Sequence, residues 1–380
     1  ANVLYLESPL GVGFSTSKDG NFTDNDIDTA EINFNAIRDF MNRVHPNYSD
    51  REYYLSGQSY AGIYVPYLAR RILIGIASGK MENTKFKGFA IGDPTFNLTT
   101  SVLTEAMHYV NYGLWPSSHT QLVLDSWSKH ERGENVDETD LDSISSLLYG
   151  EVDRTIGWDS PAAYNFNEHC YTQDSREDDE YHRPTEKRSI ACYGKHSLEL
   201  YMNKVDVQVA LHAGNNNMSA KKWSVLSPKR FAFNRDNNVL PVYDDIFKLV
   251  NGSSFRVLIY NGDMDMVKLP LHALHCAAMI AQTNSLKKHR FYRGWRFYGD
   301  FAGVRRSYRK GNITMDALTV RGAGHSVPTD LPAQAFQMIN NFLFNNEKDD
   351  IDYSEPIRKR SLLINMRYLI LNLTFHSLLP

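Results

Sequence analysis

Short apolar runs alternate with longer stretches of helical periodicity along most of the chain. The short runs lead into turns rich in Gly, Pro, Ser or Asp, as buried parallel strands do; they are Asn2–Glu7, Tyr53–Ser56, Phe86–Ile91, Phe255–Tyr260 and Ala317–Val320. The helical stretches repeat apolar residues three and four positions apart; they are Asp28–Val44, Ala61–Ile76 and Leu331–Phe344. This alternation predicts an α/β fold, with a parallel sheet covered by helices on both faces.

The middle and the end of the chain depart from this pattern. Residues 103–240 are polar, with acidic runs and one helical stretch at Leu198–His212, and we interpret them as an insertion between two core segments, 1–102 and 241–346. Residues 347–380 begin with a charged linker and end in the apolar segment Ser361–Pro380, which Arg367 and His376 interrupt. A membrane span needs about 20 more uniformly apolar residues. We therefore expect a loose tail rather than a span.

Composition narrows the class of protein. The 380 residues include 41 Lys and Arg against 44 Asp and Glu, a net charge of −3, which does not favour nucleic acid as a partner. Hydrophobic residues make up 42%, as in ordinary globular proteins. Sequons for N-glycosylation favour the secretory pathway, with a lysosomal or extracellular destination, and a signal peptide is not within the 380 residues. The candidate sites are Asn21, Asn47, Asn97, Asn217, Asn251, Asn312 and Asn372.

A serine between small residues marks the point where a predicted strand meets a predicted helix. The segment Leu55–Gly62 reads LSGQSYAG, with Gly57 two positions before Ser59 and Ala61 two positions after it. A nucleophile elbow needs small neighbours there, because its serine sits on a strained turn that exposes the hydroxyl. The same pattern also occurs at ordinary strand-to-helix turns, so a catalytic role requires partners elsewhere in the chain.

Candidate partners follow two later strands. Asp263 and Asp265 lie in a turn after the strand that ends at Tyr260, and His325 lies in a Gly-rich loop after the strand that ends at Val320. Elbow serines on α/β folds work with an acid and then a histidine later in the chain. The order and the post-strand positions predict a catalytic triad, but the residues alone do not choose between the two acids.

Six segments form an ordered set of motifs along the chain. They are Ala1–Ser17, Leu55–Ala69, Phe86–Pro94, Tyr201–Ala213, Val257–Met266 and Val320–Leu343. Together they resemble the serine carboxypeptidases and, within that family, the lysosomal cathepsin A-like branch. The resemblance spans roughly residues 1–346, is weakest in the insertion, and implies an α/β-hydrolase fold with a helical cap. It also implies release of C-terminal amino acids from peptides at acidic pH, and we expect no cofactor and no metal.

The resemblance assigns roles to the candidate residues. It implies Ser59 as the nucleophile, His325 as the general base and Asp265, rather than Asp263, as the acid that orients the histidine. The backbone amide of Tyr60 would be one donor of the oxyanion hole, a group that stabilises the transition state by about 3 to 4 kcal/mol.

Several residues depart from the family pattern. Gln58 replaces the usual Glu that helps to bind the substrate carboxylate; it resembles a permanently protonated Glu, so we expect activity to fall less steeply above pH 6. Asp93-Pro94 replaces the usual Asn-Gly, and Ser326 follows the histidine where Met is common. Both changes leave the preference for the leaving residue open.

Two further implications concern the cysteines and the N-terminus. The resemblance implies a disulfide between Cys170 and Cys192, which leaves Cys276 free. The family also carries, upstream of Ala1, a Trp-Leu-Asn-Gly-Gly-Pro-Gly block that supplies a central strand and a second oxyanion amide. We therefore expect a core without its N-terminal strands, in which unpaired backbone groups would cost about 1 to 3 kcal/mol each.

Alternatives to a peptidase stay open from the sequence. An acyltransferase or an esterase would use the same triad. A non-catalytic or protective binding homologue would fit the absent oxyanion segment. Peptides are the expected substrates, and a homodimer or a partner among the lysosomal hydrolases is the expected assembly.

Overall fold

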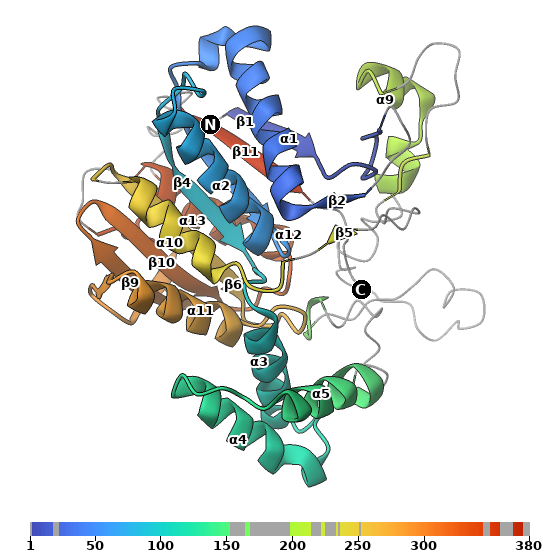
Figure 1. Ribbon diagram of the computed structural model, residues 1–380, viewed down its shortest axis with the longest axis vertical. Coiled ribbons are helices and arrows are strands. Elements are labelled where there is room, and N and C mark those ends of the chain that lie inside the picture. The colour runs from blue at the N-terminus through green and yellow to red at the C-terminus, as the bar shows by residue number, and fades with distance from the viewer. Residues whose placement is uncertain are drawn as a thin grey trace.

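A computed structural model describes most of the two core segments and parts of the insertion. The described residues are 2–17, 23–152, 164–167, 198–213, 222–224, 233–234, 236–250, 252–344, 350–357 and 368–374. Figure 1 shows a twisted sheet between layers of helices, with α3, α4 and α5 extending from one end of the sheet.

One nine-stranded sheet organises the molecule, in the order β1-β11-β3-β4-β6-β10-β9-β7, with β8 also paired to β9. The strands from β1 to β10 in this order are parallel to their neighbours, and β9 is antiparallel to β10, β7 and β8. Their bounds are β1 Asn2–Glu7, β3 Glu52–Gln58, β4 Phe86–Gly92, β6 Phe255–Gly262, β7 Lys287–Lys288, β8 Arg293–Phe297, β9 Asp300–Lys310, β10 Ile313–Val320 and β11 Tyr368–Thr374. Two short strands, β2 Asp24–Asn25 and β5 Phe233–Asn234, pair separately.

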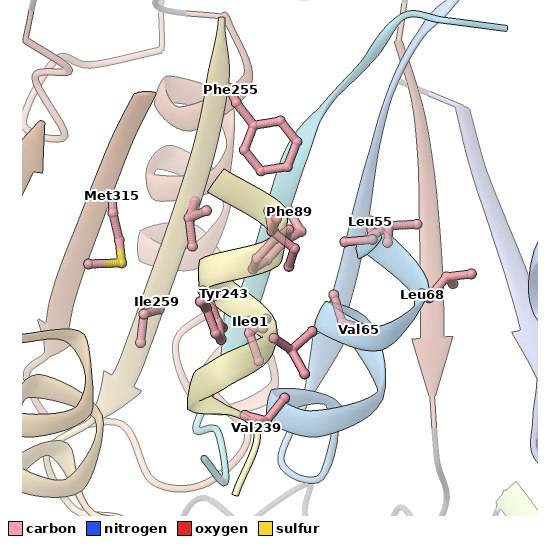
Figure 2. Close-up of a cluster of buried hydrophobic side chains, with 14 of the residues drawn as sticks. Leu55, Val65, Leu68, Phe89, Ile91, Val239, Tyr243, Phe255, Ile259 and Met315 are labelled. Atoms are coloured by element: carbon pink, nitrogen blue, oxygen red, sulfur yellow. The ribbon is translucent and has the colours of Figure 1, made fainter. Parts of the chain in front are cut away.

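Alternation along the strands gives the sheet two apolar faces. On one face, the residues of β3, β4, β6 and β10 shown in Figure 2 pack against α2 Ala61–Ala77 and α10 Leu240–Val250; Leu55, Phe89, Ile91, Ile259 and Met315 come from the strands. Helices α1 Asp26–Asp39 and α11 Pro270–Thr283 extend this layer. On the other face, the intervening strand residues pack against α13 Pro332–Phe344, next to the short helix α12 Val327–Asp330. A parallel sheet buried on both faces is the expected α/β arrangement.

The predicted elements are present, with longer bounds. Each of the five predicted strands lies within β1, β3, β4, β6 or β10, and two of the three predicted helices coincide with α2 and α13 to within a residue. The stretch predicted as one helix over Asp28–Val44 is an α-helix to Asp39 followed by a π-helical turn over Phe40–Val44. The hairpin β8–β9 was not predicted, because its many arginines hide the alternation of apolar residues that marks a strand.

The apolar end of the chain is not a loose tail in the described part. Residues 368–374 form β11, an interior strand that pairs in parallel with β1 on one side and with β3 on the other. Figure 1 shows β11 next to β1. Residues 368–374 are therefore not the loose tail that was expected, and they lie between β1 and β3 in the described sheet. The physical reason is that a strand in the interior of a sheet forms hydrogen bonds with the backbone of both neighbouring strands. An apolar sequence that contains Ile and Leu is compatible with such a buried strand.

The first part of the insertion is a small helical unit. Helices α3 Leu98–Asn111, α4 Thr120–Glu131 and α5 Glu138–Leu147 pack around their own apolar cluster, which includes Trp127 and Met266. The predicted helix over Leu198–His212 is split into residues 198–202 and α9 Val205–Ala210, because the backbone of Lys204 between them is extended. No helix of the described residues is long and apolar enough to cross a membrane.

Candidate active site

Ser59 occupies a strained turn between β3 and α2. Its φ is +61°, in the left-handed region that non-glycine residues rarely adopt. Its amide donates to Gly92 O at 2.8 Å, and its carbonyl accepts from Thr95 N at 3.0 Å, so both backbone groups are held by the loop after β4. The backbone of Thr95 lies so close that a Cβ on Gly62 would come within 2.0 Å of its carbonyl oxygen. This geometry is that of a nucleophile elbow.

A buried histidine and a buried carboxylate meet at the same edge of the sheet. His325 Nδ1 and Asp265 Oδ2 are 2.7 Å apart, and the two residues are 5% and 0% exposed. Asp265 Oδ1 also accepts from the amides of Val267 at 2.7 Å and Lys268 at 3.1 Å, which fixes the carboxylate. The other candidate acid, Asp263, accepts from Gly322 N at 2.6 Å. It therefore ties together the two loops that carry Asp265 and His325, and Asp265 is the acid that faces the histidine.

Gln58 links the elbow to the histidine loop. Its Nε2 donates to the backbone carbonyl of His325 and to Ser326 Oγ, the latter at 3.1 Å. The described contacts include no hydrogen bond between the Ser59 hydroxyl and His325. Hydrogen bonds of this kind are often long in unliganded enzymes and shorten when substrate binds.

The amide of Tyr60 lies at the N-terminus of a helix. Tyr60 is the N-cap residue of α2, directly after the nucleophile candidate. Amides at a helix N-terminus stabilise negative charge, because they point out of the helix with the positive end of its dipole. The Tyr60 hydroxyl donates to Asp26 Oδ2 at 2.9 Å, which anchors the side chain. The backbone amide, and not the side chain, is therefore the candidate oxyanion donor.

Tyr164 belongs to the site and was missed by the sequence analysis. Its carbonyl accepts from His325 N at 2.6 Å, and its ring lies 5.5 Å from the imidazole in an edge-to-face arrangement. Gly324 leaves room for this contact, since a Cβ there would lie 2.1 Å from Tyr164 O. The neighbouring residue, Asn165, donates to Asp330 Oδ2 at 3.0 Å. No motif surrounds Tyr164, so only the fold places this part of the insertion beside the histidine.

Two other groups near Asp265 were not predicted as part of the site. His108 on α3 contacts Met266, with Nε2 3.1 Å from the sulfur, and burial lowers the pKa of His108 to about 4, against the opposing charge of Asp265. Asp93, at the end of β4, is fully buried. Burial, followed by the charge of Asp265, raises the pKa of Asp93 well above its usual range.

The groups that could hold a metal coincide with the proposed triad. Among the described residues, one set of three potential ligands has its ligand atoms within 4.8 Å of one another: Asp93, Asp265 and His325. Two of these are already bonded to each other through His325 Nδ1. Elsewhere, His272 is also buried, and its Nε2 accepts from Phe96 N at 3.1 Å, a structural role.

Other predicted residues lie partly outside the described part of the chain. Cys170, Cys192, Asn21, Asn217 and Asn251 fall there, and Cys276 is a free, buried cysteine. Of the remaining sequons, Asn47 and Asn312 are exposed. Asn97 instead caps α3, with Oδ1 accepting from Thr100 N at 2.9 Å.

The fold and the site define a class of hydrolase. A strained serine after a central parallel strand, with a His–Asp pair on two further post-strand loops, is the arrangement of α/β-hydrolases that use a serine nucleophile. The family model described as serine carboxypeptidase matches residues 1–345. The chain therefore belongs to the serine carboxypeptidase family, whose members are peptide hydrolases.

Individual relatives agree with this assignment. Serine carboxypeptidase ctsa-3.2 of Caenorhabditis elegans is 28% identical over 417 residues, covering 94% of this chain and 78% of the relative. The lysosomal protective protein of Mus musculus is 28% identical, with coverage of 90% and 75%. A crystal structure of Kex1(delta)p, a prohormone-processing carboxypeptidase from Saccharomyces cerevisiae, superposes with a TM-score of 0.61 at 17% identity, covering 89% of this chain and 73% of that one. The last comparison establishes the α/β-hydrolase fold.

Proposed function

We propose that Ser59, His325 and Asp265 carry the carboxypeptidase reaction of this chain. Ser59 Oγ attacks the carbonyl of the last peptide bond while His325 Nε2 accepts its proton, and Asp265 holds the imidazole through Nδ1. The tetrahedral oxyanion accepts a hydrogen bond from the Tyr60 amide. His325 then protonates the leaving amino acid, and water hydrolyses the ester on Ser59 by the reverse sequence of proton transfers. The observation that carries this proposal is the 2.7 Å contact between His325 and Asp265 beside a strained serine.

Recognition of the peptide C-terminus is assigned to Gln58. Its side chain lies next to the nucleophile and is half-buried. Its amide group can donate to a substrate carboxylate when it gives up its bond to Ser326 Oγ, because the NH2 group has two hydrogens and the other bonds to the carbonyl of His325. We further propose that the insertion, residues 103–240, shapes the cleft; the contact of Tyr164 with His325 supports this. A site that binds a free C-terminal carboxylate favours peptides as substrates. This requirement would distinguish an exopeptidase from an esterase or an acyltransferase that uses the same triad.

A fluorophosphonate probe tests the nucleophile. We expect the full chain to be labelled, and Ser59→Ala to lose both the label and the release of C-terminal amino acids from a blocked dipeptide. Ser56→Ala, three residues earlier on β3, is the matched control and should keep both. Labelling that persists in Ser59→Ala would overturn the assignment. A folded chain without any labelling would favour a non-catalytic binding homologue.

We infer that the chain passes through the secretory pathway toward the lysosome or the cell exterior. The similarity to the lysosomal protective protein and the exposed sequons at Asn47 and Asn312 support this. Removal of N-glycans should increase the mobility of the expressed chain on gels, and each of Asn47→Gln and Asn312→Gln should remove one glycan. Unchanged mobility in both variants would contradict glycosylation at these sites.

The assembly is a separate proposal. The cathepsin A-like resemblance favours a homodimer or a complex with another lysosomal hydrolase. Sedimentation of the purified chain should show a dimer that dissociates on dilution. A monomer over the whole concentration range would contradict the homodimer and leave the hydrolase complex to be tested by co-purification.

A further inference from the structure

A second carboxyl group lies buried behind the proposed triad. Asp93 follows β4, with a φ of +47° and no exposed surface. Its amide donates to Tyr260 O at 2.7 Å, and its Oδ1 accepts from Gly262 N at 2.9 Å and from Asn261 Nδ2 at 3.2 Å. Its other oxygen, Oδ2, has no hydrogen-bond donor among the described residues. A buried carboxylate oxygen without a donor is costly, whereas a protonated oxygen can itself donate.

The open oxygen has a neighbour that can accept. Carboxyl oxygens of Asp93 and Asp265 lie within 4.8 Å of each other and of a ring nitrogen of His325. Asp265 receives three donors, from Val267 N, Lys268 N and His325 Nδ1. Two buried carboxyl groups this close do not both ionise without a large cost, so one of them keeps a proton. The donors are concentrated on Asp265, which places the proton on Asp93.

We propose that Asp93 is a positioning residue of the triad, which as a neutral acid donates a hydrogen bond from Oδ2 to the Asp265 carboxylate and so keeps that carboxylate ionised and aimed at His325. The proposal rests on the roles assigned above to Asp265 and His325. Asp93 touches no substrate and acts through Asp265 alone. Asp93 differs from a purely structural residue, because its proposed role depends on whether its carboxyl group carries a proton.

Ionisation of Asp93 would change the electrostatic environment of His325. The titratable groups that face it are Asp265 and Tyr260 from β6 and the loop after it, Asp330 from α12, and His325 from the loop after β10. Burial and the charge of Asp265 both raise the pKa of Asp93. When Asp93 does ionise, a second negative charge next to the triad favours the imidazolium form of His325. A protonated histidine cannot accept the proton of Ser59, so activity falls on the alkaline side.

The substitution Asp93→Asn separates charge from shape. The amide keeps an acceptor for Gly262 N and can donate toward Asp265, as the neutral acid does, but it cannot ionise. We expect Asp93→Asn to match the wild type in kcat at pH 5 and to retain about threefold to tenfold more of that activity at pH 8, with KM unchanged at both. Superimposable pH profiles for the two proteins would overturn the proposal.

A stability measurement tests the same point without catalysis. An acid whose pKa is raised on folding makes the folded state bind more protons than the unfolded chain, so stability is lost as pH rises above about 4, the unfolded pKa of Asp. In a Ser59→Ala background, Asp93→Asn should therefore raise Tm by roughly 1 to 4 °C at pH 7 and by less at pH 4. Asp300→Asn on β9, which is exposed, should show no such trend. A Tm difference that does not change with pH would also overturn the proposal, whatever the outcome for Ser59.

Discussion

Gln58 holds the histidine loop against the elbow, and in the proposed mechanism the same side chain also binds the substrate carboxylate. As an amide it donates both to the carbonyl of His325 and to Ser326 Oγ. A glutamate at this position could donate only while protonated, and once ionised it would face the His325 carbonyl and the substrate carboxylate with like charge.

We therefore predict that Gln58→Glu makes the decline of kcat/KM above pH 6 steeper than in the wild type. The difference between the two proteins should shrink as pH falls toward about 4, because the protonated fraction of the glutamate rises there. The exposed Gln121→Glu on α4 serves as a control for added charge. Equal pH profiles for the wild type and Gln58→Glu would show that Gln58 does not contact the substrate carboxylate.

Gly62 is needed for the sharp turn at Ser59. An added Cβ would lie 2.0 Å from Thr95 O and 2.7 Å from Thr95 N, and backbone atoms cannot swing aside as a flexible side chain can. We predict that Gly62→Ala lowers the free energy of unfolding by about 1 to 3 kcal/mol and reduces fluorophosphonate labelling. Gly150→Ala, whose added Cβ would meet nothing within 4 Å, should change stability by less than about 0.5 kcal/mol. Urea unfolding measures both, and equal effects would contradict the close approach of Thr95.

At the scale of elements, β11 joins the two ends of the chain into one sheet. Its residues pair with all six residues of β1 and with residues 52–57 of β3, so it separates the first strand from the strand that leads to Ser59. A strand with neighbours on both sides uses each of its amides in a ladder hydrogen bond. Proline at such a position removes a donor and is confined in nature to edges and bulges.

We predict that Leu371→Pro destabilises the protein by at least roughly 2 kcal/mol, the cost of unpaired buried backbone groups. Leu371→Ala, which keeps the backbone amide, is the matched control and should cost less. In hydrogen exchange, amides of 368–374 should be protected as strongly as those of β3. If Leu371→Pro and Leu371→Ala have the same small effect, this segment is not an interior strand.

At the scale of the whole molecule, the buried side chain of His272 makes the protein less stable at acidic pH. His272 is fully buried, and burial, then the charge of Lys268, lowers its pKa to about 3. The folded state thus binds fewer protons than the unfolded chain between the folded pKa and the unfolded value near 6.5. Stability from this group is complete above pH 6.5 and is lost as pH falls through that window.

We predict that the wild type loses about 1 kcal/mol of unfolding free energy per pH unit below pH 6 for this group, and that His272→Gln has a correspondingly flatter dependence. Glutamine can still accept from Phe96 N but does not titrate. His119→Gln, an exposed residue, should leave the slope unchanged. Chemical denaturation at pH 5 and pH 7 makes the comparison, and identical slopes for wild type and His272→Gln would contradict the burial argument.

Periodicity and turn chemistry in the sequence predicted the central elements, because both are local. The strands β1, β3, β4, β6 and β10 and the helices α2 and α13 follow from runs of apolar residues and the turns that bound them. The candidates Ser59 and His325, and the pair of acids Asp263 and Asp265, follow from where such runs end, since parallel strands bring their carboxyl ends to one edge. The hairpin β8–β9 was missed because its many arginines hide the alternation of apolar residues that marks a strand.

The sequence by itself determined the α/β order of elements, the elbow serine and, through its motifs, the family. Only the tertiary structure decided which acid faces His325, that Tyr164 packs on it, that Asp93 lies behind Asp265, and that residues 368–374 fill the sheet between β1 and β3. The physical reason is the same for each. These contacts join residues far apart in the chain, and their energies depend on burial and on partners that exist only once the sheet has formed.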